Sequence, residues 1–400
     1  MRKNILFITG QFIPYTKSIG GVIRVYSFLQ TLKKKYNVYL LADSGNYNGY
    51  LGLSKKSLDL VNIVYLKKKK ISATLYLFKN FIFFIILKNL LYLLSIDYSF
   101  SSSYFQKTLK IIESKKINYV IISGPPFSLF FLINKIKKKF PYIKIIVDYR
   151  DSWTGRINNP SLLLVQKIVR NFIEKKILNL VEYILVATNN IKKNLSHITK
   201  KKIILITNGY INNFNNTKLT QRSGRSKKIL VGYFGLISDQ SGGYRDIKIL
   251  YNIFKNDLFL QNKYIFYFFG NNTISKTSIK NFSIFKFKKN IPYKNVLSVM
   301  RQMDYLLCLH TDHTTSKEVI TGKLYEYISS KRPVIFISAG VTEGGEIVKK
   351  YRLGYSLNYL NTSLKIFFKN LKKNSKFIAN KNISMFSRKV QNKKLLKIIK

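Results

Sequence analysis

Cysteine and histidine are nearly absent from this chain of 400 residues, which contains one cysteine, Cys308, and three histidines. A single cysteine excludes a disulfide framework and fits a reducing compartment. Two histidines stand close together in His310-Thr-Asp312-His313, but no further ligands follow at a spacing typical of a metal site. No Ser-His-Asp or Cys-His arrangement is visible either. The sequence therefore predicts no metal site and no nucleophilic dyad or triad.

Acidic residues are also scarce, since 17 Asp and Glu stand against 70 Lys and Arg, for a formal net charge of +53 at pH 7. Such a charge favours polyanionic partners: nucleic acid, an anionic membrane surface or phosphorylated substrates. The chain lacks a recognised nucleic-acid module and an arginine-rich tract, so we expect no nucleic-acid partner. Two interpretations remain open. The charge either serves membrane binding or reflects a composition biased toward lysine, asparagine and isoleucine.

Long uninterrupted apolar runs are missing as well. The N-terminal run, residues 5–8, is too short for the apolar region of a signal peptide and predicts a first buried strand instead. We therefore expect the chain to remain in the cytoplasm.

The segment 74–96 is mostly apolar and follows the basic run Lys67–Lys70. A transmembrane helix needs about 20 predominantly apolar residues, and here only 81–87 is unbroken. The interruptions are Lys79, Asn80, Lys88 and Asn89. Two explanations remain: helices lying in a membrane interface, or a buried helix pair with exposed ends. The adjacent basic run favours peripheral contact with the inner face of the cytoplasmic membrane.

Short apolar runs alternate with longer helical patterns along the chain, which predicts parallel sheets covered by helices. In the first half we expect strands at residues 4–9, 37–42, 61–66, 118–123, 143–148, 182–187 and 202–206. In the second half we expect strands at 229–235, 263–269, 304–310 and 334–337. Each half predicts a doubly wound α/β domain that binds ligands at the carboxyl ends of its strands.

The predicted domains are residues 1–210 and 229–373. A polar stretch rich in Asn, Ser, Thr and basic residues, 211–228, has the character of a linker. The basic end, 374–400, contains no apolar strand. It predicts either a helix that packs back across the domain junction or a frayed tail.

Two carboxylates, Glu318 and Glu326, stand eight positions apart where a loop is expected to run into a helix. On a helix this spacing corresponds to an azimuthal difference of about 80°. Gly322 and Lys323 lie between them, in the first turn, where free N–H groups and a lysine would hold an anion. The combination could bind a phosphate and a sugar hydroxyl together, which indicates a nucleotide sugar.

Two further groups follow strands of the first half. Gly20 and Gly21, with Arg24 behind them, lie between the first strand and the first helix, where the backbone can approach an anion closely. Asp148 and Asp151 follow the fifth strand and flank an arginine, with the chain's one tryptophan after them. These carboxylates could bind sugar hydroxyls or take a proton, and the tryptophan could stack on a sugar. An ordinary flexible loop and a simple arginine–aspartate pair are the alternatives.

Taken together, these motifs resemble those of the family 4 glycosyltransferases, particularly the bacterial enzymes of O-antigen and capsule synthesis. The resemblance covers about residues 4–360 and rests on Gly20-Gly21 with Arg24, Val147–Thr154, Thr207–Gly209, Gly232–Gly235 and, above all, Lys323–Val334. It implies a GT-B fold, in which two Rossmann-like domains face each other across a cleft. It also implies retaining transfer from a nucleotide sugar without a catalytic metal.

The resemblance suggests roles by position. Glu326 matches the second glutamate of the family's E-x7-E motif, which binds the donor ribose, and Glu318 matches the first, which faces the transferred sugar. Val319-Ile-Thr321 depart from the usual Phe-Gly pattern between them. The family's diphosphate clamp follows the first strand of the second domain, which ends at Gly235. In that region the chain offers Arg245 or Lys248, which Lys323 could supplement.

The expected function is therefore hexosyl-type transfer from a nucleoside diphosphate sugar to a lipid-linked saccharide, with no cofactor, in surface polysaccharide synthesis. Two other classes remain open. A GT-B-fold sugar-nucleotide epimerase would bind the same donor but would need no membrane segment. A non-enzymatic protein that binds polyanions or membranes would explain the charge but not the ordered motifs.

Deletion of residues 81–87 is expected to abolish most of the association with vesicles containing anionic lipid, because it removes the longest apolar run of the segment. Vesicle flotation measures this, with neutral vesicles as the control. If a deletion variant with an unchanged circular dichroism spectrum still floats like the wild type, the membrane interpretation is wrong.

Overall fold

The computed structural model describes residues 2–16, 19–45, 58–67, 102–153, 164–211, 227–240, 245–311, 319–373 and 381–399. The chain divides into two compact units, Met1–Thr207 with Gln391–Lys400 and Asn208–Val390. The predicted membrane segment 74–96 and Glu318 lie outside the described residues. No helix in the described part of the chain has the length and apolar character to cross a bilayer.

The first unit is built on a seven-stranded sheet in the order β3-β2-β1-β4-β5-β6-β7, with all neighbours parallel. Its strands are β1 (Asn4–Gln11), β2 (Asn37–Ser44), β3 (Val61–Lys67), β4 (Tyr119–Gly124), β5 (Lys144–Tyr149), β6 (Tyr183–Val186) and β7 (Ile203–Leu205). All seven strands expected in the first half are present. The strand order reverses between β1 and β4, and sheets of this kind bind ligands at the carboxyl ends beside such a point.

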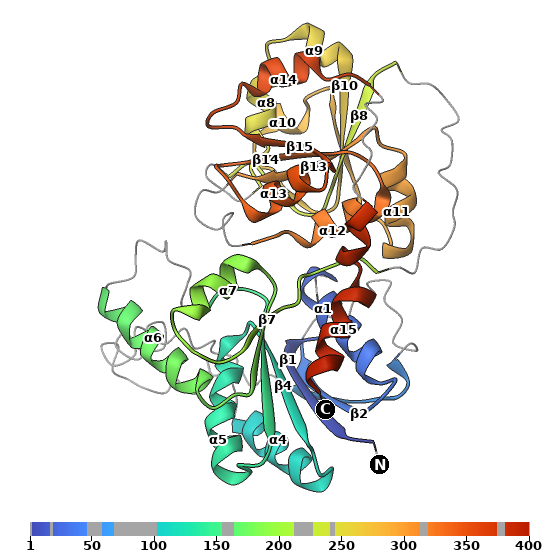
Figure 1. Ribbon diagram of the computed structural model, residues 1–400. Helices are drawn as coiled ribbons and strands as arrows, with labels where there is room; N and C mark the ends of the chain where they lie inside the picture. Colours follow the sequence, from blue (N-terminus) through green and yellow to red (C-terminus); the bar gives the residue numbers. More distant parts are fainter. Residues whose placement is uncertain are drawn as a thin grey trace, which may run out of the picture. The chain divides into compact units, whose positions relative to one another are not determined.

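Helices cover both faces of this sheet (Figure 1). One face carries α1 (Ile19–Leu32) and α15 (Arg388–Ile398), and the other carries α4 (Ser102–Ser114), η2 (Phe127–Phe131), α5 (Leu132–Lys139), α6 (Leu164–Leu178) and α7 (Asn189–Ser196). Successive side chains of β1 point to opposite faces of the sheet, because side chains alternate along a strand. Phe7 meets Phe28 of α1 at 6.4 Å between ring centroids, whereas Leu6 and Ile8 belong to the core on the opposite face.

The second unit has a six-stranded parallel sheet in the order β12-β10-β8-β13-β14-β15. Its strands are β8 (Ile229–Phe234), β10 (Tyr264–Phe269), β12 (Phe285–Lys288), β13 (Tyr305–His310), β14 (Val334–Ser338) and β15 (Gly354–Asn358), and the short β9 (Ile237–Ser238) pairs with β11 (Asn272–Thr273). The four strands expected from apolar runs are present. The two edge strands, β12 and β15, were not expected, because their polar and apolar residues are mixed.

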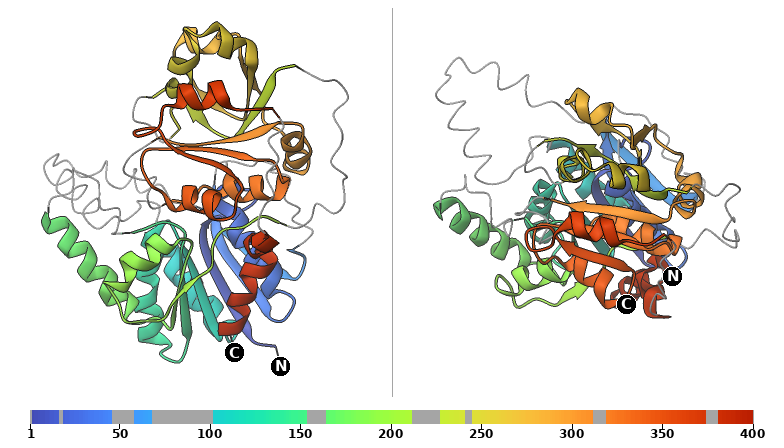
Figure 2. Two further views of the ribbon diagram at one scale, coloured as in Figure 1. Left: turned by 45° about the horizontal axis from the view of Figure 1, so that its top comes forward. Right: turned by 90° about the horizontal axis from the view of Figure 1, so that it is seen from above.

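Two layers of helices enclose the second sheet (Figure 2). The aromatic-rich core on one face is closed by α8 (Lys248–Phe254), α9 (Leu258–Lys263), α10 (Thr277–Lys280) and α14 (Leu364–Asn370). The core on the other face is closed by α11 (Tyr293–Arg301), α12 (Gly322–Ser330) and α13 (Glu343–Lys350). The reversal of strand order lies between β8 and β13, so the loops after these strands are the expected ligand-binding region.

The predicted tail, 374–400, contains η3 (Lys381–Phe386) and α15. The boundary between the two units falls within α15, after Val390, so most of this helix belongs to the first unit. There Asn392 Nδ2 donates to the carbonyl of Ser27 in α1 at 2.8 Å.

Near the junction of the units the outgoing and returning chains run together, where Tyr210 and Ser387 form a parallel bridge. The Tyr210 amide donates to the Phe386 carbonyl at 3.0 Å, and the Arg388 amide donates to the Tyr210 carbonyl at 2.8 Å. A Cβ on Gly209 would lie 2.3 Å from the Phe386 carbonyl oxygen. Glycine is therefore required for the two chains to approach this closely.

Gly209→Ala is expected to lower the free energy of unfolding by about 1–3 kcal/mol, because the added methyl group forces the paired chains apart. Urea denaturation measures the loss. The matched control is Gly21→Ala in α1, where a Cβ meets nothing within 4 Å and alanine is favoured in a helix. Equal stability of the two variants would contradict the close-approach argument.

Candidate functional site

The start of α12 has the features of an anion-binding site. Its N-cap residue, Thr321, makes no capping hydrogen bond through its side chain. Among the described residues, no group accepts from the N–H of Gly322 or Lys323. Gly322 is exposed, and a Cβ there would meet nothing within 4 Å. A ligand can thus approach the backbone donors, and the helix dipole favours one with negative charge.

The Lys323 side chain is held against the carboxyl end of β8. Its Nζ donates to the Tyr233 hydroxyl at 2.6 Å and lies 3.9 Å from the centre of the Tyr233 ring. The backbone of Gly235 leaves room for it, since a Cβ there would lie 2.6 Å from Lys323 Cε. Gly235 also has a φ of +121°, which disfavours any residue with a side chain. The predicted residues Gly235, Gly322 and Lys323 therefore meet in one place.

The electrostatics of Lys323 indicate that this place suits an anion. Burial of the ammonium group, together with the positive charge of Arg245, holds the pKa of Lys323 well below its usual value. Cys308 acts in the opposite sense, but no carboxylate of the described residues acts on this lysine. A bound anion would supply the missing negative charge and favour the charged form of the lysine.

The structure distinguishes the two other predicted cations. Arg245 is the one whose charge reaches Lys323. Lys248 is directed toward Asp246, with 3.9 Å between Nζ and Oδ2, and its amide donates to Asp246 Oδ1 at 2.9 Å. The Asp246 amide in turn donates to Thr311 Oγ1 at 2.9 Å. Lys248 thus helps to shape the loop after β8, while Arg245 belongs with the anion site.

Glu326 follows Lys323 by about one turn on α12. It is half-buried, and the hydroxyl of Tyr293 donates to its Oε1 at 3.1 Å. Burial raises the pKa of Glu326 to about 7, although the Tyr293 hydrogen bond and the charge of Arg388 act in the opposite direction. A carboxylate thus stands about one helical turn beyond Lys323 on the same helix; its binding of sugar hydroxyls stays a prediction. Its predicted companion, Glu318, lies outside the described residues.

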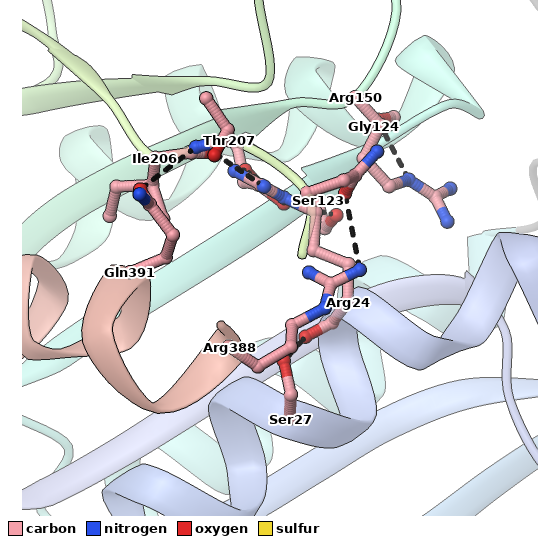
Figure 3. A network of polar contacts seen from close by, with 11 residues as sticks. Arg24, Ser27, Ser123, Gly124, Arg150, Ile206, Thr207, Arg388 and Gln391 are labelled. Carbon is pink, nitrogen blue, oxygen red and sulfur yellow. Dashed lines mark hydrogen bonds and ion pairs between the residues drawn. The ribbon is translucent and has the colours of Figure 1, made fainter. Parts of the chain in front are cut away.

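In the first unit, two predicted site residues, Arg24 and Asp148, bind each other. Figure 3 shows Arg24, Ser123 and Ile206 in the polar network around this pair. Arg24 donates to Asp148 Oδ1 from Nε at 3.0 Å and from Nη2 at 2.7 Å. Ser123 Oγ donates to Asp148 Oδ2 at 2.8 Å, and Arg24 Nη1 donates to the Ile206 carbonyl at 2.6 Å. The side chains of Arg24 and Asp148 are 1% and 0% exposed.

This pairing corrects the roles expected from the sequence for Arg24 and Asp148. A carboxylate with no exposed surface, already engaged by a guanidinium and a hydroxyl, has no face left for a substrate. Arg24 likewise directs its guanidinium inward and joins α1, β5 and the end of β7. Both residues hold the carboxyl end of the first sheet together, and neither contacts a ligand directly.

Gly20 and Gly21 lie in the first turn of α1, which begins at Ile19, and not in the loop before the helix, where the sequence placed them; Gly20 is exposed. This first turn is braced by Arg150, whose guanidinium donates to the carbonyls of Gly21, Gly124 and Pro125. Burial lowers the pKa of Arg150 from its usual value. Arg150 therefore pairs mainly with backbone oxygens, which differs from the arginine–aspartate alternative. It ties the first turn of α1 to the end of β4 and the loop after it.

Asp151 and Trp153 differ in how accessible their side chains are to a ligand. Asp151 is half-buried beside Arg150, and its carboxylate hydrogen-bonds to no described residue. Trp153 is only 4% exposed and stacks on Phe127 at 5.6 Å between ring centroids, with Phe130 and Phe131 at its edge. The expectation that the tryptophan stacks on a sugar is therefore wrong, because the ring is almost fully buried and already packs against three phenylalanine rings.

The sequence did not point to three residues that shape the second unit's site: Tyr233, Tyr293 and Arg388. Tyr233 lies inside an apolar strand, where it resembles any core residue. Tyr293 and Arg388 are distant from Glu326 in the sequence, and no spacing relates them. Only the fold brings these side chains to Lys323 and Glu326.

No protein-family model and no curated protein sequence matches this chain. Solved structures do match. The sucrose-phosphate synthase of Thermosynechococcus elongatus is 11% identical, with a TM-score of 0.64 over 99% of this chain and 98% of its own. The α,α-trehalose-phosphate synthase (UDP-forming) of Burkholderia vietnamiensis is 8% identical, with a TM-score of 0.61 over 99% of both chains. The lipopolysaccharide outer core galactosyltransferase WaaB, in its apo form, is 13% identical, with a TM-score of 0.56 over 98% of both chains.

The likeness to these structures extends over nearly the whole length of each chain. It confirms the predicted fold class: the chain has the GT-B fold, with two doubly wound α/β units. At identities of 8 to 13%, the likeness establishes the fold and leaves the reaction to be argued from the residues.

Replacing one partner of the Arg24–Asp148 pair, as in Arg24→Met, is expected to lower the free energy of unfolding by about 3–5 kcal/mol, because a buried charge is left uncompensated. The double variant with Asp148→Leu is expected to cost less than the sum of the single variants. Urea denaturation measures both.

The control for this experiment is Lys139→Met, which breaks a 3.4 Å pair with Glu113 whose side chains are 50% and 65% exposed. An exposed pair of this kind contributes at most about 1 kcal/mol. Strict additivity of Arg24→Met and Asp148→Leu would show that the two groups do not act as a pair.

Proposed function

We propose that this chain is a glycosyltransferase that moves a sugar from a nucleoside diphosphate sugar to an acceptor. The observation that carries the proposal is the cationic site at the start of α12: Lys323 with Arg245 nearby, the free N–H groups of the first turn, and Glu326 one turn further on. Phosphate oxygens suit the cations and N–H donors. A carboxylate at this spacing suits the hydroxyl groups of a ribose.

The proposed site would stabilise the leaving group. When the bond between the sugar and the diphosphate breaks, negative charge develops on the diphosphate, and preorganised donors aimed at that charge lower the barrier. Lys323 and Arg245 supply positive charge, and the N–H groups of Gly322 and Lys323 supply fixed dipoles. These groups can perform the neutralising role that a divalent cation has in other transferases, so we propose a reaction without a metal.

Positive charge would develop on the sugar ring in the same step. Glu318 is the carboxylate that we propose for offsetting it, from its place in the family motif. Asp151 of the first unit, half-buried beside Arg150, stays a candidate for binding sugar hydroxyls or taking a proton. Retention of configuration follows from the resemblance to family 4. Arg24, Asp148 and Lys248 have no direct part in the proposed reaction, because each is engaged in the scaffold.

We further propose that the acceptor is a lipid-linked saccharide of bacterial surface polysaccharide synthesis, O-antigen or capsule, and that the enzyme works peripherally at the inner face of the cytoplasmic membrane. Three observations support this. They are the family 4 motifs, the lipopolysaccharide galactosyltransferase among the similar structures, and the chain's net charge of +53 together with its apolar segment 74–96. An epimerase with the same fold would bind the same donor but would transfer nothing to the acceptor.

The proposal is tested with a panel of nucleotide sugars and a membrane lipid extract as the acceptor source, by measuring nucleoside diphosphate release and transfer of labelled sugar. Lys323→Met is expected to lower kcat by about 10²- to 10³-fold, as for the loss of one transition-state donor. The control is Lys349→Met, an exposed lysine on α13, which is expected to retain full activity. Binding of a nucleotide sugar without release of the diphosphate would overturn the transferase assignment.

A further inference from the structure

The carboxylate of Glu326 is held from a neighbouring helix. Tyr293, the first residue of α11, donates its hydroxyl to Glu326 Oε1 at 3.1 Å. At the other end of the helix pair, Arg332 donates from Nε to the carbonyl of Arg301 at 2.8 Å. The first residue of α11 is therefore tied to the middle of α12 and its last residue to the segment after α12, and Tyr293 has a defined position relative to Glu326.

A second group acts on Glu326 from the returning chain. Arg388 is buried, and its positive charge lowers the pKa of this carboxyl group. Its position is fixed by its amide, which donates to the Tyr210 carbonyl at 2.8 Å, and by Nη2, which donates to Asn208 Oδ1 at 3.3 Å. The phenol of α11 and the guanidinium at the start of α15 thus both favour the ionised carboxylate.

The hydrogen bond from Tyr293 leaves the two oxygens of Glu326 in different situations. Oε1 accepts from the phenol, whereas Oε2 accepts no hydrogen bond from any described residue. An ionised carboxylate accepts hydrogen bonds and donates none. The arrangement therefore presents one oriented acceptor oxygen on a residue about one turn of α12 beyond Lys323.

We propose that Tyr293 is a positioning residue for the donor substrate: by binding Oε1 it orients Glu326 so that Oε2 accepts from the ribose hydroxyls of a nucleoside diphosphate. This inference rests on the proposed function, because it assumes that the α12 site binds a nucleotide. Tyr293 itself does not touch the ligand.

The arrangement predicts a pH dependence. Burial raises the pKa of Glu326 to about 7, so the carboxyl group is largely protonated below this pH and ionised above it. The ionised form binds ribose hydroxyls, and nucleotide affinity is therefore expected to increase by about tenfold between pH 6 and pH 8. In the described part of the chain, the charged and titratable groups that act on Glu326 are Tyr293 and Arg388, and both lower its pKa. Removing the Tyr293 hydroxyl moves the transition to higher pH.

The test is isothermal titration of the full chain with the one of UDP, GDP, ADP or dTDP that the wild type binds most tightly, from pH 6 to pH 8.5. Glu326→Gln is expected to weaken binding by about 10- to 100-fold and to remove the Glu326 transition, leaving the titrations of the ligand's phosphate and of Lys323. Tyr293→Phe is expected to weaken binding by about three- to tenfold at pH 7 and to shift the transition upward.

The decisive measurement is the double variant Tyr293→Phe with Glu326→Gln. If Tyr293 acts through Glu326, the double variant binds as weakly as Glu326→Gln alone and no weaker. If the two losses multiply, or if Tyr293→Phe leaves the transition where it is in the wild type, the positioning role is overturned while the nucleotide site stands. Unchanged binding by Glu326→Gln overturns the nucleotide site itself. Tyr251→Phe on α8, far along the chain from this site, is the matched control and is expected to bind as the wild type does.

Discussion

A lysine ammonium group held against a tyrosine ring and a glycine backbone is the constraint on which the second unit's site depends. Removing such a charge from water costs several kcal/mol unless an opposite charge comes close, and no carboxylate in the described part of the chain does so for Lys323. Neighbouring residues hold the Lys323 side chain in this position. Gly235 leaves the space, Tyr233 accepts the hydrogen bond, and the uncapped start of α12 adds further donors. The folded chain thus keeps a positive site that an anionic ligand would complete.

The first unit uses its charged residues differently. Arg24 and Asp148 neutralise each other out of contact with solvent, and the guanidinium of Arg150 donates hydrogen bonds to three backbone carbonyls. These contacts join α1, β4, β5 and the segment after β7, which are far apart in the sequence. A buried pair of this kind contributes little net stability but penalises any arrangement that separates its members. Its effect here is to fix the position of Gly20 and Gly21, which remain at the surface beside the carboxyl ends of the strands.

The strands of both sheets were predictable wherever the strand is covered on both faces, because such a strand must be apolar throughout and stands out from the helical patterns around it. The sequence did not predict the edge strands β12 and β15, because Phe285-Lys-Phe-Lys288 and Gly354-Tyr-Ser-Leu-Asn358 mix polar with apolar residues. For the site residues, too, the local pattern decided which could be found. Gly235, Gly322, Lys323 and Glu326 lie within short motifs: Gly235 directly follows β8, Gly322 and Lys323 begin α12, and Glu326 follows about one turn later. Tyr293 and Arg388 reach Glu326 only through the packing of α11 and the return of the chain at α15.

The sequence by itself determined the fold class, the alternation of strands and helices, and the places where reactive side chains could emerge, because these depend on local pattern and on the geometry of parallel sheets. It could not determine which charged side chains face a ligand and which face each other. Asp148 lies near the end of β5 and Glu326 lies within α12, and both carry a carboxyl group. Asp148 is neutralised by an arginine from a helix more than a hundred residues earlier, whereas Glu326 keeps one oxygen without a described partner. That difference arises from contacts between distant segments, which only the tertiary structure brings together.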